Sequence, residues 1–111
     1  MLSLPPSVRV FVYTAPTDMR KSFDALCALV ETVLKQDPFS GHLFVFLSRR
    51  RDKVKILYWD RSGVFLLYKR LEEGTFWMPE RAEIGARELM MVLEGIDASA
   101  VRQHRRYQRR P

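Results

Sequence analysis

Apolar positions along the chain follow two different periods. The stretch 8–13 is rich in β-branched and aromatic residues, which predicts a strand. After a turn at 15–18 that we expect to supply an N-cap, apolar residues recur at three- and four-residue steps from Met19 to Leu34. This spacing predicts one long helix with an apolar face. Pro38 should end the helical stretch, because proline disfavours helical geometry at the residue before it.

The segment from His42 to Met78 has turn residues between short apolar runs, which is the pattern of a β-meander. The turns at 60–63 and 71–74 each end in glycine, which tolerates the left-handed conformation that closes a tight hairpin. Side chains alternate along a strand, so we expect one face of this meander to meet the helix and the other to be mixed apolar and basic. The apolar runs predict four strands, at 43–48, 54–60, 64–71 and 75–78.

The last third of the chain predicts a second helix and a tail. Apolar residues among charged ones indicate a less regular helix over 81–93, weakened by Gly85 and ended by Gly95. Residues 98–111 are polar and rich in arginine, and we expect a flexible tail that becomes ordered only when bound.

These elements predict an α+β fold. We expect a single domain at 1–97, with a mostly antiparallel sheet made of the N-terminal strand and the meander. The long helix would cover one face of that sheet, and the second helix would pack at an edge. The Arg-rich tail, 98–111, would follow the domain.

Composition is that of a small soluble protein. With 111 residues, 47% of them apolar, one core is expected. No apolar run approaches the ~18 residues that span a bilayer, and the first residues do not resemble a secretory signal, so we expect a cytoplasmic protein with no membrane partner. Cys27 is the only cysteine, and His42 and His104 are the only histidines. We therefore expect no disulfide, no metal site and no cofactor.

The formal charge of +6 is distributed unevenly. Residues 41–71 carry eight basic and two acidic side chains, a balance of +6, whereas 72–100 carry two basic and seven acidic ones, a balance of −5. The last eleven residues add five arginines and no acid. This segregation indicates a surface for a polyanion, and an acidic element that either binds a basic partner or folds back on the protein.

The basic block predicts contact with DNA. Several cations fall at the tip of the first predicted hairpin, where a β-ribbon can enter a groove or straddle phosphates. The strands of a meander would bring the remaining cations into the same sheet area. The alternative is an ordinary solvated loop. The candidate DNA-binding residues of this block are Arg49, Arg50, Arg51, Lys53, Lys55, Arg61, Lys69 and Arg70.

The tail predicts a second, less specific contact. Arginine-rich arms follow phosphate backbones, lose affinity steeply with salt and confer little sequence preference. The alternative is a tail that only improves solubility. The candidate residues are Arg102, Arg105, Arg106, Arg109 and Arg110.

Catalytic interpretations have little support. The aspartates that a two-metal site would need are explained by helix starts, solvated faces and turns. His104 and Tyr107 have the spacing of a tyrosine recombinase only superficially, because such a nucleophile needs a rigid pocket. Cys27 lies on the apolar face of the predicted helix and is expected to be a small buried hydrophobe. We therefore assign no catalytic residue.

Four ordered strings of the chain resemble one known family. They are 18–24 (DMRKSFD), 37–46 (DPFSGHLFVF), 49–60 (RRRDKVKILYWD) and 68–72 (YKRLE). Over about 8–78 the sequence resembles the accessory protein TnpB of insertion-sequence-66-type transposable elements, which is unrelated to the RNA-guided nuclease of that name. The resemblance implies a bacterial cytoplasmic protein that assists transposition beside a separate transposase and a small helix-turn-helix protein. It implies no catalytic residues, since none are assigned in the family.

Two hypotheses for the function follow. The first is a non-catalytic accessory protein of transposition that binds DNA, at the ends of the element, through the basic hairpin surface and the tail. The second is an interaction module that docks the transposase through the exposed sheet face or the acidic helix, with little DNA contact of its own. A nuclease or strand-transfer enzyme is the least favoured class.

Overall fold

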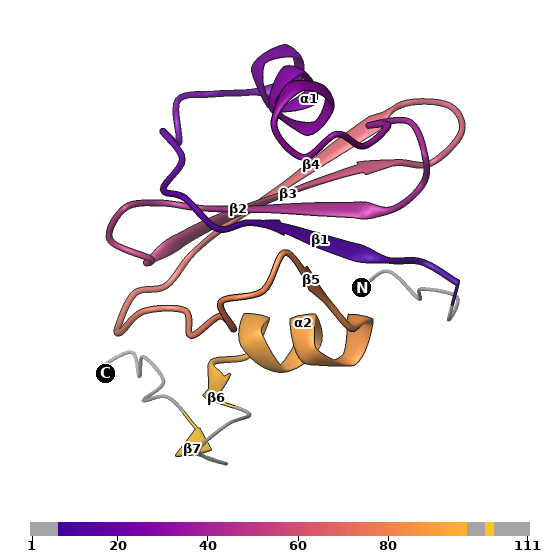
Figure 1. Ribbon diagram of the computed structural model, residues 1–111. Coiled ribbons are helices and arrows are strands. Elements are labelled where there is room, and N and C mark those ends of the chain that lie inside the picture. Colours follow the sequence, from indigo (N-terminus) through magenta and orange to yellow (C-terminus); the bar gives the residue numbers. More distant parts are fainter. Residues whose placement is uncertain (1–6, 98–101, 104–111) are drawn as a thin grey trace.

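Five strands form one sheet in the computed structural model, which describes residues 7–97 and 102–103 (Figure 1). The strands are β1 (Val10–Tyr13), β2 (Leu43–Leu47), β3 (Lys53–Trp59), β4 (Val64–Arg70) and β5 (Glu83–Ile84). Their order across the sheet is β4-β3-β2-β1-β5.

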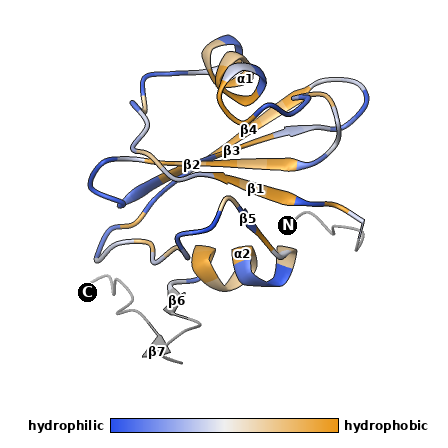
Figure 2. Ribbon diagram, in the orientation of Figure 1, coloured by the Kyte–Doolittle hydropathy of each residue, from blue (hydrophilic) through white to orange (hydrophobic). Residues whose placement is uncertain are grey.

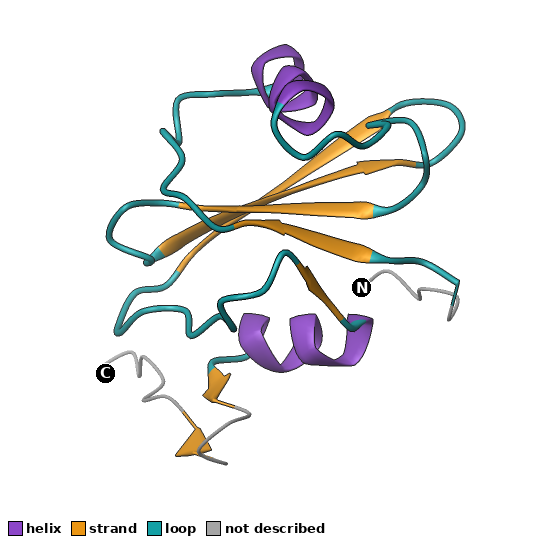
Figure 3. Cartoon of the chain, in the orientation of Figure 1, coloured by secondary structure: helices purple, strands orange, loops and turns teal. Residues whose placement is uncertain are grey.

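Helices lie on both sides of this sheet (Figure 3). Helix α1 (Phe23–Thr32) covers one face, and α2 (Ala86–Leu93) lies against the other, near β5. After α2, β6 (Ile96–Asp97) pairs with β7 (Arg102–Gln103) in a separate two-stranded sheet. Within the described residues, neither helix has the length and apolar character needed to cross a bilayer.

The sheet is mixed because β1 and β2 run parallel. Val10 lies beside Leu43, and Tyr13 lies beside Phe46. The connection between the two strands contains α1, and such a crossover returns the chain in its original direction. The other neighbouring strands are antiparallel. The prediction of a mostly antiparallel sheet is therefore wrong, because an apolar pattern indicates a strand but not its direction.

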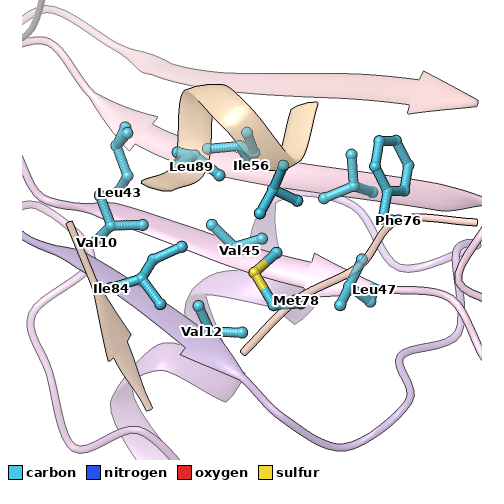
Figure 4. Close-up of a cluster of buried hydrophobic side chains, with 12 residues drawn as sticks. Val10, Val12, Leu43, Val45, Leu47, Ile56, Phe76, Met78, Ile84 and Leu89 are labelled. Carbon is cyan, nitrogen blue, oxygen red and sulfur yellow. The ribbon is translucent and has the colours of Figure 1, made fainter. Parts of the chain in front are cut away.

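Both faces of the sheet are largely buried at β1, β2 and β3, whereas β4 is largely exposed. On one face, Phe44 and Leu57 of the strands pack with Leu26 and Val30 of α1. Figure 2 shows the strands between the two helices as predominantly hydrophobic. The second helix thus packs on a face and not at an edge. The face that was expected to be mixed apolar and basic is core over β1, β2 and β3, and it is exposed at β4, where Phe65 and Leu67 are 46% and 44% exposed. The cluster on that face (Figure 4) contains Val10, Val12, Leu43, Val45, Leu47, Val54, Ile56, Phe76, Met78, Ile84, Leu89 and Val92.

Helix α1 is shorter than predicted and begins later. It spans 10 residues, and its N-cap is Ser22. Asp18 instead forms a turn, in which its Oδ1 accepts a hydrogen bond from the Arg20 N–H (2.9 Å) and its Oδ2 lies 2.7 Å from the Arg20 guanidinium. The side-chain hydrogen bonds of Arg20, followed by its backbone N–H, lower the pKa of Asp18 to about 2.

The segment between β4 and α2 differs most from the prediction. Residues 71–74 form no hairpin and 75–78 form no strand; Phe76 and Met78 fill the core from irregular backbone. Glu83 and Ile84, expected in a helix, pair with β1 instead. Apolar composition alone does not distinguish a buried irregular segment from a strand.

The hairpin predicted at 60–63 is confirmed. The Asp60 N–H donates to the Gly63 carbonyl (3.1 Å), and Asp60 Oδ1 accepts from the N–H groups of Ser62 and Gly63. These backbone hydrogen bonds lower the pKa of Asp60. The positive φ of the turn is 84° at Arg61, so the strained conformation falls on an arginine and not on Gly63.

Candidate nucleic-acid interface

The loop between β2 and β3 presents three consecutive arginines at one end of the sheet (Figure 1). The Ser48 hydroxyl donates to Asp52 Oδ1 (3.1 Å) and accepts from the Lys53 N–H (3.1 Å). The Arg51 N–H donates to the Ser48 carbonyl (3.0 Å). Arg51 has a φ of 58°, in the left-handed region, where the chain turns back into β3. The arginines therefore lie on a loop of defined backbone.

The segment after β4 anchors this loop to the core. The Leu71 N–H donates to the Asp52 carbonyl (2.7 Å), and the Phe76 N–H donates to the Arg51 carbonyl (2.7 Å). Phe76 is buried. Arg49 and Arg50 remain exposed, whereas Arg51 is half-buried. The loop thus presents two exposed arginines on a hydrogen-bonded backbone.

Two further cations lie beside the loop. Lys53 and Arg70 face each other across β3 and β4. With Tyr68 and Glu72 they line an open hollow of about 340 Å³. Alternation along the strands places Lys53, Tyr68 and Arg70 on the face that α1 covers. We call the following residues the basic end: Arg49, Arg50, Arg51, Lys53 and Arg70.

Acidic side chains neutralise part of the basic end. Glu72 lies 2.9 Å from Arg70, and this hydrogen bond raises the pKa of the arginine. Asp52 lies 3.6 Å from Lys53 Nζ; burial opposes its ionisation, but the Ser48 hydroxyl and the charge of Lys53 lower its pKa overall. Arg49 and Arg50 form no ion pair in the described part of the chain. The charge of Arg50 also helps to lower the pKa of Asp52, but neither guanidinium group is held in an ion pair with a described residue.

Three predicted cations are separated from the basic end. Arg61 lies in the β3–β4 turn, at the other end of the sheet (Figure 1). Lys69 lies on the opposite face from Arg70, where its Nζ donates to the Leu93 carbonyl (2.6 Å). The expectation that all eight cations converge is wrong for these positions. Arg61 lies at the far turn, and Lys69 points to the opposite face from Arg70 because neighbouring residues of a strand alternate between faces.

Lys55 is the third of these separated cations and is only 6% exposed. Its Nζ donates to the carbonyls of Met19 (2.6 Å) and Lys21 (2.7 Å) and lies 4.7 Å from the centre of the Tyr68 ring. It therefore fixes the segment before α1 against the sheet and is not accessible to DNA at this surface.

The candidate tail lies mostly outside the described residues. Arg102 belongs to β7, whose backbone pairs with β6. Arg105, Arg106, Arg109 and Arg110 lie outside the part of the chain that the structure describes. Their contact with DNA stays a prediction.

The acidic stretch folds back on the protein. Glu83 pairs with Arg9 (2.7 Å), and the hydrogen bond from Arg9 lowers the pKa of Glu83. Glu88 pairs with Arg81 and accepts a hydrogen bond from the Gly85 N–H (3.1 Å) at the start of α2. Of the two roles that the sequence left open, the structure shows the internal one for these carboxylates.

In residues 7–97 and 102–103, no three or more histidine, cysteine, aspartate or glutamate side chains come together in a group that could hold a metal ion. Cys27 is half-buried, and burial raises the pKa of its thiol. A raised pKa disfavours the reactive thiolate at neutral pH.

The positions of Tyr68 opposite Lys55 and of Glu72 beside Arg70 were not predicted from the sequence. These positions could have been predicted from the turn at 60–63, because a tight hairpin fixes which residues of its two strands lie opposite each other. Counting outward from Asp60 and Gly63 places Lys53 opposite Arg70 and Lys55 opposite Tyr68, as observed.

Comparison with known proteins identifies the family. The family model TnpB_IS66, described as IS66 Orf2-like protein, matches residues 8–103. The chain belongs to the IS66 Orf2-like family. The match includes every strand of the five-stranded sheet and the whole basic end, and it extends beyond the stretch that carried the resemblance in the sequence. Membership of the IS66 Orf2-like family associates the protein with an insertion sequence and its transposition.

Two relatives of this IS66 Orf2-like protein occur in Sinorhizobium fredii (strain NBRC 101917 / NGR234). The uncharacterized protein y4jC is 34% identical over 106 residues, which cover 92% of this chain and 91% of the relative. The uncharacterized protein y4hO is 41% identical over 102 residues, which cover 87% and 88%. No solved structure matches the chain.

Proposed function

We propose that this protein is a non-catalytic accessory factor of transposition that binds DNA through the basic end. Its family supports the link to transposition. The observation that supports the DNA contact is the pair Arg49 and Arg50, which are exposed on a hydrogen-bonded loop and take part in none of the ion pairs of the described residues. Guanidinium groups bind phosphate oxygens with two parallel hydrogen bonds, and a fixed loop loses little conformational entropy on binding.

The contact would position the protein on DNA without reading bases. Phosphate contacts supply affinity and orientation but carry no direct sequence information. Lys53 at the start of β3 extends the cationic surface from the loop towards Arg70. The predicted tail arginines would add a second, salt-sensitive contact. Preference for the ends of the element would then come from a partner, for which the separate transposase and the small helix-turn-helix protein, in the bacterial cytoplasm, are the candidates.

Docking of the transposase with little DNA contact is the competing function. The engagement of Glu83 and Glu88 by arginines of the same chain disfavours the acidic stretch as a site for a basic partner. Co-purification of the transposase that survives nuclease treatment would favour docking, whereas loss of the complex on digestion would favour DNA contact.

Charge reversal at two ends of the same sheet tests the proposal. The double variant Arg49→Glu/Arg50→Glu removes two phosphate contacts and should weaken binding to a duplex roughly tenfold or more at physiological salt. Arg61→Glu reverses one charge at the opposite end of the sheet, so its matched counterpart is Arg50→Glu alone, and Arg61→Glu should weaken binding much less than that single variant. Fluorescence anisotropy with an element-end duplex and an unrelated duplex measures these losses. Equal losses in the two single variants would contradict a local site.

A further inference from the structure

Strand β4 is the outer strand of the sheet and carries an exposed apolar surface. No described strand lies beyond it. Residues 64–68 are all apolar or aromatic, and Phe65, Leu67 and Tyr68 are 46%, 44% and 53% exposed. Edge strands of soluble proteins usually carry charges, prolines or bulges that prevent pairing with another chain. In β4 the only charged residues are Lys69 and Arg70, at the C-terminal end, so nothing in the sequence of the rest of the strand prevents it from pairing with another strand.

Hydrogen bonds show which backbone groups of β4 are free. The Asp60 N–H donates to the Gly63 carbonyl, and the Leu71 N–H donates to the Asp52 carbonyl. In an antiparallel strand, the backbone N–H and C=O groups of successive residues point alternately towards the neighbouring strand and away from it. Counting in steps of two from Gly63 to Leu71 therefore assigns the odd-numbered residues to β3. The groups that point outward belong to Val64, Leu66, Tyr68 and Arg70.

We propose that β4 pairs antiparallel with β4 of a second copy of this chain, about a two-fold axis at Leu67. In this register Leu66 lies opposite Tyr68 of the partner subunit, and Val64 lies opposite Arg70 of the partner subunit. All four positions belong to the outward-pointing set, so every new hydrogen bond uses groups that β3 leaves free. Leu67 faces the partner's Leu67 in a non-hydrogen-bonded position, where side chains approach most closely.

The charges of β4 favour this register. Lys69, whose Nζ donates to the Leu93 carbonyl of its own chain (2.6 Å), lies opposite Phe65 of the partner subunit and so faces no second cation. Arg70 lies beside an apolar residue, so no like charges face each other across the pair. An axis at Lys69 would place two lysines together and leave only the ends of the strands overlapping. The pairing at Leu67 joins the full strands.

This self-complementarity identifies a second copy as the occupant. A two-fold contact uses the same surface on both subunits, so each favourable pair occurs twice. A strand from an unrelated protein would gain the backbone hydrogen bonds but not this matched sequence. The combined sheet would have ten strands, twice the five of one chain, with the two basic ends at opposite ends of the sheet.

Charge exchange at the axis tests the dimer. Sedimentation velocity of the full chain should show a dimer at micromolar concentration. Leu67→Lys and Leu67→Glu each bring like charges together and should raise the dimer dissociation constant about a hundredfold. An equimolar mixture of the two variants should restore the dimer, because opposite charges then face each other. Val33→Lys changes another exposed apolar residue, 50% exposed at the end of α1, and should leave the dimer intact.

Each other result overturns the proposal. A monomeric wild-type chain would exclude the dimer, and a monomer that binds purified transposase through Leu67 would assign the edge to that protein. A Leu67→Lys variant that stays dimeric would place the contact elsewhere. Variants that are monomeric alone but do not recombine would exclude the two-fold register. Far-UV circular dichroism and urea unfolding establish that each variant is folded.

Discussion

Replacing Lys55 separates its structural role from a role in DNA binding. The side chain is 6% exposed, and its Nζ joins β3 to two carbonyls of the segment before α1. Lys55→Met keeps an unbranched apolar stem of similar length but removes the donor. The carbonyls of Met19 and Lys21 then lose a hydrogen bond at 2.6 and 2.7 Å respectively.

The cost of this substitution follows from those two contacts. A carbonyl left unpaired in a buried site costs about 1–3 kcal/mol. Removing the ammonium also removes the penalty for desolvating its charge, which offsets part of the loss. We expect a net decrease of about 2–4 kcal/mol in the free energy of unfolding. That is a large fraction of the ~5–15 kcal/mol typical of a domain.

Urea unfolding measures the effect. With a slope of about 2 kcal/mol/M, the midpoint should fall by about 1–2 M. Lys21→Met is the matched control, because the Lys21 side chain is exposed and its carbonyl is unchanged by the substitution. DNA affinity of folded Lys55→Met should equal that of the wild type. An unchanged midpoint together with weaker DNA binding would refute the structural role and support the original sequence-based prediction.

Two further predictions concern stability. Arg61→Gly should raise the free energy of unfolding by about 1 kcal/mol, because glycine adopts a φ of 84° without the strain that arginine bears; thermal unfolding measures this. The lowered pKa values of Asp18, Asp60 and Glu83 mean that these carboxylates bind protons more weakly in the folded state. Their stabilisation should be complete above their unfolded pKa values of about 4, and it should be lost as the pH falls towards the folded pKa of about 2 for Asp18. Urea midpoints between neutral and acidic pH measure that loss, and Asp60→Asn should reduce it.

Specific results would contradict each of these two predictions. A lower melting temperature for Arg61→Gly would show that the turn is not strained at that residue. A urea midpoint that rises or stays constant on acidification would contradict the assigned carboxylate contacts. The same acid response in Asp60→Asn as in the wild type would remove Asp60 from the set.

Local patterns predicted much of the fold. The alternation and turn residues located β2, β3 and β4 to within about a residue, and the turn at 60–63 was found from its residues alone. The apolar repeat located α1, although the helix is shorter than the repeat. These features depend on neighbouring residues, which a sequence displays directly.

Features that depend on distant residues were not predictable in this way. The parallel pairing of β1 with β2 depends on how the α1 crossover packs. The burial of Lys55 depends on carbonyls more than thirty positions away. Phe76 and Met78 have the composition of a strand, yet they fill a core that forms only when α2 covers the sheet. The sequence therefore predicted the arginines of the loop correctly as part of the basic end, but it assigned too many cations of the strands to the same surface.

The most direct measurement of DNA contact at the basic end is the salt dependence of binding. The logarithm of the association constant should fall linearly with the logarithm of salt concentration, with about 0.9 in slope for each neutralised phosphate. In Arg49→Glu/Arg50→Glu that slope should be shallower by about two units. Identical slopes for the wild type and this variant, or binding that does not respond to salt, would show that these arginines do not contact DNA.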